Sequence, residues 1–63
     1  MNLVEALQLV LKRRTMTVTE AAEAVQRAGY RTTSANFRTI VNQALIANKK
    51  LFRKVARGQY VAK

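Results

Sequence analysis

Neither cysteine nor histidine occurs in this chain of 63 residues, and this absence constrains the fold more than any other sequence feature. Disulfides and Cys/His zinc sites, on which very small domains often depend, are therefore excluded. A chain this short buries only about 60% of the surface that its unfolded form exposes. The fold must be held by apolar contacts alone, and a content of 49% apolar residues is consistent with one small domain over residues 1–63.

Charge is the second strong feature, because twelve Lys and Arg against three acids give a formal net charge of +9. Such an imbalance costs stability through self-repulsion, and a polyanionic partner is the usual reason for it. Nucleic acid is the first candidate, an anionic membrane surface the second and an acidic protein the third. The basic residues are spread over several segments rather than along one apolar-faced helix, which argues against the membrane surface.

Reactive side chains are scarce, which argues against catalysis. The only carboxylates are Glu5, Glu20 and Glu23, and the only serine is Ser34. Without His, Cys or Asp, most acid–base and nucleophile–base arrangements cannot be assembled. Too few oxygen ligands remain for a metal. We expect no enzyme activity, no cofactor, no metal and no small-molecule substrate.

No targeting segment is visible in the sequence. The N-terminal apolar stretch is interrupted by Glu5 and Gln8 and has no basic region before it, unlike a signal peptide. No stretch approaches the ~20 apolar residues that span a bilayer. The sequence therefore predicts a cytoplasmic protein, associated with the nucleoid.

The first half of the chain predicts two helices. Apolar residues recur with helical spacing over residues 2–14, which end in the basic triplet 12–14. That triplet suits either a helix C-terminus or a phosphate contact. Thr17 and Glu20 fit a capping box for the second helix, and Gly29 fits the C′ position of a Schellman motif. The short run 16–18 can also pair as a strand with the later hairpin.

A third helix, over about residues 34–48, has the strongest periodicity in the chain. Its expected buried face consists of Phe37, Ile40, Val41, Ala44 and Leu45, with Asn48 in the same register. Three hydroxyl residues, Thr32, Thr33 and Ser34, precede it. At least one of them is expected to cap the helix, and the others can contact a phosphate at its N-terminus.

Residues 51–56 and 59–62 predict two antiparallel strands joined by a tight turn at Arg57-Gly58. With a two-residue turn, Val55 would pair with Tyr60 on the face over the helices. Lys54 and Val61 would then face away, with Arg57 at the tip. Because a core this small needs its aromatic side chains, Phe52 and Tyr30 are expected to be buried rather than to stack on bases.

The stretch from Thr32 to Asn42 looks like a recognition helix, and the stretch from Lys50 to Tyr60 looks like a basic wing. With three helices before the hairpin, the chain resembles the winged helix-turn-helix superfamily. The nearest resemblance is to small bacterial modules related to HARE-type domains and to the N-terminal domain of the RNA polymerase delta subunit. The resemblance implies a mainly α fold, with three helices and a two- or three-stranded antiparallel wing. The segment 29–33 is longer than the turn of a minimal helix-turn-helix.

This resemblance implies binding to double-stranded DNA, with the third helix in the major groove and the wing on the backbone or in the minor groove. The outward face of that helix carries Ala35, Arg38, Thr39, Asn42, Gln43 and Ile46 and no acid. It is therefore either a DNA-reading face or a solvated polar face. The predicted DNA-binding residues are Thr32, Thr33, Ser34, Arg38, Thr39, Asn42, Gln43, Lys49, Lys50, Arg53, Lys54 and Arg57.

Three questions stay open at this stage. Nucleoid-associated and transcription-related roles fit the residues equally well. Lysine on the edge of a hairpin also prevents edge-to-edge aggregation, without any contact to DNA. The alternatives to DNA binding are a winged helix for protein–protein interaction in a transcription or replication assembly, and binding to structured RNA.

Overall fold

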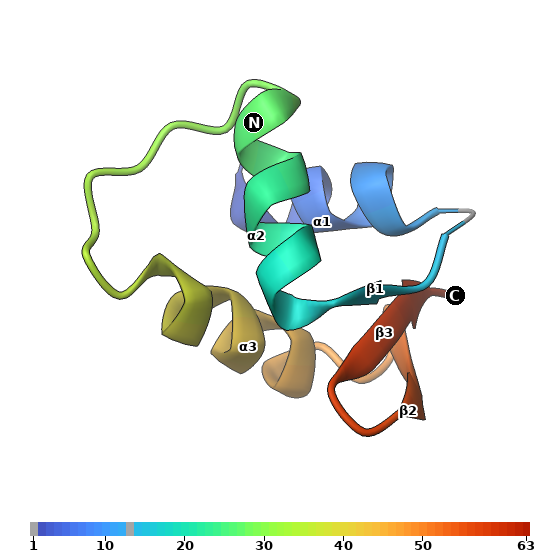
Figure 1. Ribbon diagram of the computed structural model, residues 1–63. Coiled ribbons are helices and arrows are strands. Elements are labelled where there is room, and N and C mark those ends of the chain that lie inside the picture. The colour runs from blue at the N-terminus through green and yellow to red at the C-terminus, as the bar shows by residue number, and fades with distance from the viewer. Residues whose placement is uncertain (1, 13) are drawn as a thin grey trace.

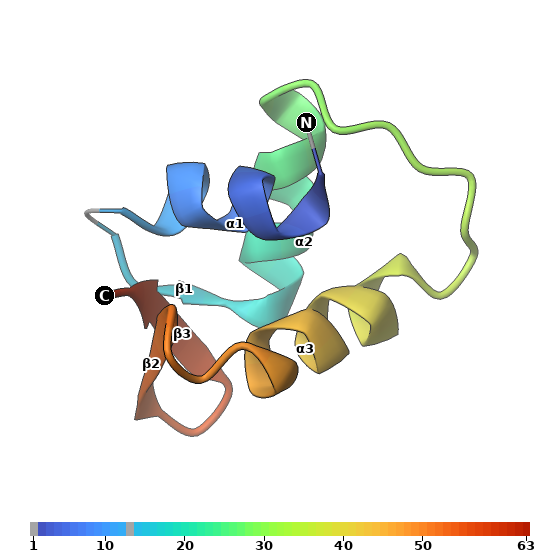
Figure 2. The same cartoon turned by 180° about the vertical axis from the view of Figure 1, so that it is seen from behind.

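In the computed structural model, which describes residues 2–12 and 14–63, three helices pack against a small antiparallel sheet (Figures 1 and 2). The sheet has the strand order β1-β3-β2, so the last strand of the chain is the central one. The predicted third strand over residues 16–18 is thus confirmed as a short pairing. The elements are α1 (Leu3–Leu11), β1 (Met16–Thr17), α2 (Val18–Arg27), α3 (Phe37–Ala47), β2 (Phe52–Ala56) and β3 (Gln59–Ala62).

Helix α1 starts with a capping box and is shorter than predicted. The Asn2 side chain accepts a hydrogen bond from the Glu5 N–H at 2.8 Å, and the Glu5 carboxylate accepts one from the Asn2 N–H at 3.1 Å. The helix ends at Leu11, the last residue of the apolar repeat, with Lys12 as C-cap. Lys12 and Arg14 therefore lie at and after the end of the helix rather than in its last turn, and Arg13 of the predicted triplet is outside the described residues.

Helix α2 follows β1 without a linker, because Thr17 belongs to the strand and also caps the helix. The Thr17 hydroxyl accepts a hydrogen bond from the Glu20 N–H at 3.1 Å, and the Thr17 N–H donates to the Glu20 carboxylate at 3.0 Å. In the sheet, Met16 is opposite Tyr60 and Thr17 is opposite Gln59. The predicted capping box is confirmed.

Replacing Thr17 with alanine is expected to lower the free energy of unfolding by about 1 kcal/mol, because the Glu20 N–H loses its acceptor. The backbone pairing of β1 does not depend on this side chain. Thr19 is the matched control: it is an exposed threonine in the first turn of the same helix. Urea unfolding of both alanine variants measures the difference, and equal losses would contradict the capping role.

The end of α2 also agrees with the prediction. The Tyr30 N–H donates to the Val25 carbonyl at 2.9 Å, and the Gly29 N–H donates to the Gln26 carbonyl at 3.1 Å. These are the two bonds of a Schellman motif, and Gly29 has the φ of +110° that the motif requires of its C′ residue. The chain then leaves the helix with the Tyr30 ring stacked on Phe37, at 5.6 Å between ring centroids.

Helix α3 begins at Phe37, three residues later than predicted. Asn36 is the N-cap residue and makes no side-chain capping bond. The Thr32 hydroxyl instead accepts from the Ser34 N–H at 3.2 Å, and the Ser34 hydroxyl accepts from the Asn36 N–H at 3.3 Å. The expectation that Thr32, Thr33 or Ser34 caps α3 is therefore wrong. Short polar side chains bond readily to nearby backbone, and here these bonds stabilise the loop rather than the helix.

The buried face of α3 is narrower than predicted. Phe37, Val41 and Leu45 are buried at four-residue spacing, whereas Ile40 is 40% exposed and does not belong to the core. Residues four apart lie nearly in line along a helix, so Phe37, Val41 and Leu45 form one narrow buried stripe. Ile40 lies three residues after Phe37 and therefore at the edge of this stripe. Asn48 ends the helix: its side chain donates to the Ala44 carbonyl at 2.7 Å, and its own carbonyl accepts from the N–H groups of residues 51 and 52.

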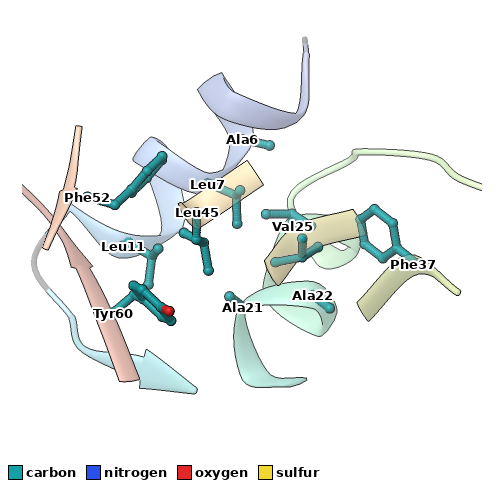
Figure 3. Close-up of a cluster of buried hydrophobic side chains, with 11 residues drawn as sticks. Ala6, Leu7, Leu11, Ala21, Ala22, Val25, Phe37, Leu45, Phe52 and Tyr60 are labelled. Atoms are coloured by element: carbon teal, nitrogen blue, oxygen red, sulfur yellow. The ribbon is translucent and has the colours of Figure 1, made fainter. Parts of the chain in front are cut away.

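The core lies between the three helices and the inner face of the sheet (Figure 3). Phe52 and Tyr60 extend from the hairpin toward Leu11, so the hairpin is part of the core. The expected burial of Phe52 is confirmed, and Tyr30 packs against the core while partly exposed. The buried side chains are Ala6, Leu7, Leu11, Ala21, Ala22, Val25, Phe37, Val41, Leu45, Phe52 and Tyr60.

The hairpin has the predicted turn but not the predicted register. Ala56 is opposite Gln59 across the Arg57-Gly58 turn, and Gly58 has a φ of +72°. A register shift between Lys54 and Ala56 then leaves Val55 as a bulge, 49% exposed. The simplest two-residue turn needs positive φ at both central residues, and Arg57 does not have it. The bulge supplies the twist that this turn does not provide.

Because of the bulge, Lys54 rather than Val55 is opposite Tyr60. Residues directly opposite each other in an antiparallel pair lie on the same face of the sheet. The prediction that Lys54 faces away from the helices together with Val61 is therefore wrong. Arg53 is the residue opposite Val61, and Lys54 lies on the inner face, beyond the edge of the core.

Candidate nucleic-acid interface

The acids and the bases of this chain are separated along the sequence. All three carboxylates lie in the first 23 residues, whereas residues 24–63 contain nine Lys and Arg and no Asp or Glu. Two of the carboxylates, Glu5 and Glu20, accept capping bonds. In the described part of the chain the one ion pair joins Glu23 and Arg27 at 4.0 Å, and it is exposed, so it contributes little. The cations of α3 and the hairpin therefore face solvent with no acid of their own segment nearby.

An open hollow of about 610 Å³ joins three elements, and none of its lining residues is acidic. Its wall includes the start of α2 at Val18, one flank of α3 and the hairpin turn at Gly58. In Figure 1 the start of α2, α3 and the β2–β3 turn border the same part of the molecule. The lining residues are Val18, Ala35, Asn36, Arg38, Thr39, Asn42 and Gly58.

The structure brings three of the predicted site residues together in this hollow, which are Arg38, Thr39 and Asn42. Arg38 and Asn42 are four residues apart and so lie one above the other on the flank of α3 that faces the hairpin. Arg38 and Thr39 are exposed and Asn42 is partly buried. Gln43 is exposed on the same helix but does not line the hollow.

The predicted basic residues of the wing lie around the end of α3 and along β2. Lys49 and Lys50 are exposed in the turn between these two elements, and Arg57 is exposed at the hairpin tip. A second hollow, of about 430 Å³, lies between the last turns of α3 and the sheet. Its lining contains Leu45, Ile46, Phe52 and Tyr60, together with the cations Lys49, Arg53, Lys54 and Lys63.

Sequence reasoning missed Lys63 and the gathering of cations around Ile46. Lys63 is placed beside the second hollow by its N–H, which donates to the Leu51 carbonyl at 2.9 Å. Its charge was visible in the sequence, but its position depends on how the two strands pair. Ile46 was assigned to the outward face, where it is 48% exposed.

The structure separates Thr32 and Thr33 from the hollow that contains Arg38, and Ser34 does not line that hollow either. The loop between α2 and α3 extends on the side of the molecule away from the hairpin (Figures 1 and 2). Thr32 and Thr33 border a different hollow, next to Tyr30 and Arg31. Ala35, predicted on the outward face of the helix, lies in the turn before α3.

Comparisons with known proteins do not add to this picture. A scan against protein-family models found no match, and searches of curated proteins and of solved structures found none either. Within residues 2–12 and 14–63, no group of three or more His, Cys, Asp or Glu is placed to hold a metal ion. None of the described helices has the length and apolar character needed to cross a membrane.

Proposed function

We propose that this chain is a winged helix-turn-helix module that binds double-stranded DNA, in a nucleoid-associated or transcription-related role. In this proposal α3 enters the major groove and the β2–β3 hairpin is the wing. The observation that carries it is the hollow in which Arg38, Thr39 and Asn42 lie beside the hairpin turn, with no acidic residue in the lining. The order of three helices followed by a hairpin docked on their core also supports the resemblance to the bacterial winged-helix modules.

The side chains on the flank of α3 suit direct readout of bases. Arginine bonds to guanine through two donors, and asparagine bonds to adenine through a donor and an acceptor. Side chains four apart on a helix are about 5–6 Å from each other. Stacked base pairs are about 3.4 Å apart along the duplex. Arg38 and Asn42 can therefore reach base pairs that are neighbours or next neighbours.

The remaining cations suit the phosphate backbone. Lys49, Lys50, Arg53 and Lys54 lie on the end of α3 and on β2, and Arg57 extends the wing at its tip. Each cation that neutralises a phosphate releases a condensed counterion, which favours binding without regard to sequence. The N-terminus of α3 has no side-chain cap and no acid in its first turn, so its dipole favours an anion at that end of the helix.

Alanine variants of Arg38 and Asn42 test whether α3 reads bases. Each is expected to lose about 1–3 kcal/mol of binding free energy on a selected duplex and much less on random duplex. Arg57→Ala is expected to weaken both duplexes alike and to reduce the salt slope by about one unit, because it contacts the backbone. Selection of preferred sites, followed by anisotropy titrations of the variants on the selected and random duplexes, measures both effects.

Arg27→Ala is the control, since Arg27 is an exposed cation of α2 outside both hollows. If the alanine variants of Arg38 and Asn42 lost the same binding free energy on the selected and the random duplex, α3 would contact only the phosphate backbone. Unchanged binding for Arg38, Asn42 and Arg57 would place the DNA on another face and contradict the proposed interface.

A further inference from the structure

The second hollow combines two features that a solvated surface rarely combines. Its floor is apolar: Leu45, Phe52 and Tyr60 are buried beneath it, and Ile46, which is 48% exposed, supplies the accessible apolar surface. Its rim is basic, and the bulge contributes to this by placing Lys54 on the same face of the sheet as Tyr60. Lys49 and Lys63 complete the rim from the end of α3 and the end of β3.

No Asp or Glu side chain lines this hollow to balance the charge around its floor. No acid occurs in residues 24–63, which contain all the lining residues of the hollow. A half-exposed apolar side chain favours a ligand with an apolar group, and the cations around it favour a ligand with carboxylates. A ligand that carries both groups is complementary to the whole hollow. A duplex brings charge through its phosphates, but the apolar groups that it exposes in the major groove are single thymine methyls, which cover less of Ile46 than a bulky side chain does.

We propose that this hollow binds an acidic peptide segment with one bulky apolar side chain. The apolar side chain packs on Ile46, and flanking carboxylates pair with Lys49, Lys54 and Lys63. Lys49 and Lys54 are also part of the proposed DNA interface. Insofar as that function holds, peptide and duplex compete, and the acidic segment regulates DNA binding.

The probe is a short Glu-rich peptide with a single tryptophan. The protein contains no tryptophan, so the peptide emission alone reports burial of the ring. We expect saturable binding with a shift of the emission to shorter wavelength. Burial of the exposed half of Ile46 is worth roughly three- to tenfold in affinity, so Ile46→Ser is expected to weaken binding by that factor.

Ile40→Ser is the matched control, because Ile40 is 40% exposed on the same helix and outside the hollow. It is expected to leave peptide affinity unchanged, and thermal melts of both variants check that the fold is intact. Lys63→Gln is expected to weaken binding, whereas Lys12→Gln, at the end of α1, changes it little. A peptide with serine in place of tryptophan is expected to compete at least threefold less well.

Two results would overturn the peptide site. Equal losses for Ile46→Ser and Ile40→Ser, or equal competition by the serine peptide, would show attraction by charge alone. A loss of duplex affinity in Ile46→Ser as large as the loss of peptide affinity would assign the hollow to the DNA interface. Peptide binding without any binding of duplex would instead contradict the proposed DNA function and leave the peptide site standing.

Discussion

Replacing Phe37 with alanine is expected to lower the free energy of unfolding by about 3–5 kcal/mol. The side chain is 6% exposed at the start of α3, where the long loop joins the core (Figure 3). Its ring stacks on that of Tyr30. Its loss leaves a cavity and also removes the partner of Tyr30. At roughly 0.05–0.15 kcal/mol per residue, a domain of this size has little more stability than that to lose.

Thermal and urea unfolding of the Phe37→Ala variant measure this effect. Ile40→Ala is the control, because it is a large apolar side chain in the next turn of α3 that lies outside the core. Its effect is expected to stay within about 0.5 kcal/mol. A Phe37 variant that melts cooperatively near the parent temperature would contradict the packing of α3 described above.

The affinity for duplex DNA is expected to fall roughly a hundredfold to several thousandfold between 50 and 200 mM salt. This range follows from about 4–7 phosphates neutralised, each contributing about −0.9 to the slope of log K against log salt. The physical basis is the set of cations on α3 and the hairpin, which have no acid in their own part of the sequence.

Anisotropy titrations across salt, with random duplex, single-stranded DNA and duplex RNA, measure the slope and the preference among the three. A module that only docks on proteins would bind all three weakly and alike. A nearly flat salt dependence with duplex DNA would contradict the nucleic-acid interpretation.

The features that the sequence predicted correctly are determined locally. Thr17 and Glu20 are three residues apart, and their reciprocal bonds depend on little beyond the first turn of α2. Gly29 ends the same helix because a positive φ is needed within one residue of its C-cap. The hairpin turns at Gly58 for a similar reason, since this position of the turn needs a positive φ. In each case the interacting groups are neighbours in the chain, so residue type and spacing are sufficient.

The features that were wrong depend on contacts between distant segments. Ile40 fits a helical repeat, but its exposure depends on how α3 lies against α1 and α2. The hydroxyls of Thr32 and Ser34 could accept hydrogen bonds either from the first turn of α3 or from the loop backbone. The path of the loop brings them to the loop N–H groups of Ser34 and Asn36. Val55 became a bulge because the turn and the pairing with β3 had to be satisfied together.

The candidate site shows the same division. Arg38 and Asn42 were predicted to share a helix flank, and periodicity alone was sufficient for that. Their position beside Gly58, and the gathering of Lys54 and Lys63 around Ile46, follow from the docking of the hairpin on the core. No local pattern encodes that docking, since β3 is more than 40 residues from its partner β1 in sequence.

Thr17, the residue shared by β1 and the N-cap of α2, connects the sheet directly to the second helix. Thr17 pairs with Gln59 through its backbone and caps α2 through its side chain, and no residue lies between strand and helix to act as a hinge. A displacement of β3 is therefore passed to the first turn of α2, and from there to the fully buried Ala21. A ligand that tilts the β2–β3 hairpin must therefore strain this junction or move α2 as a rigid body. Because α2 is packed in the core, the packing of the helices resists such a movement of the hairpin.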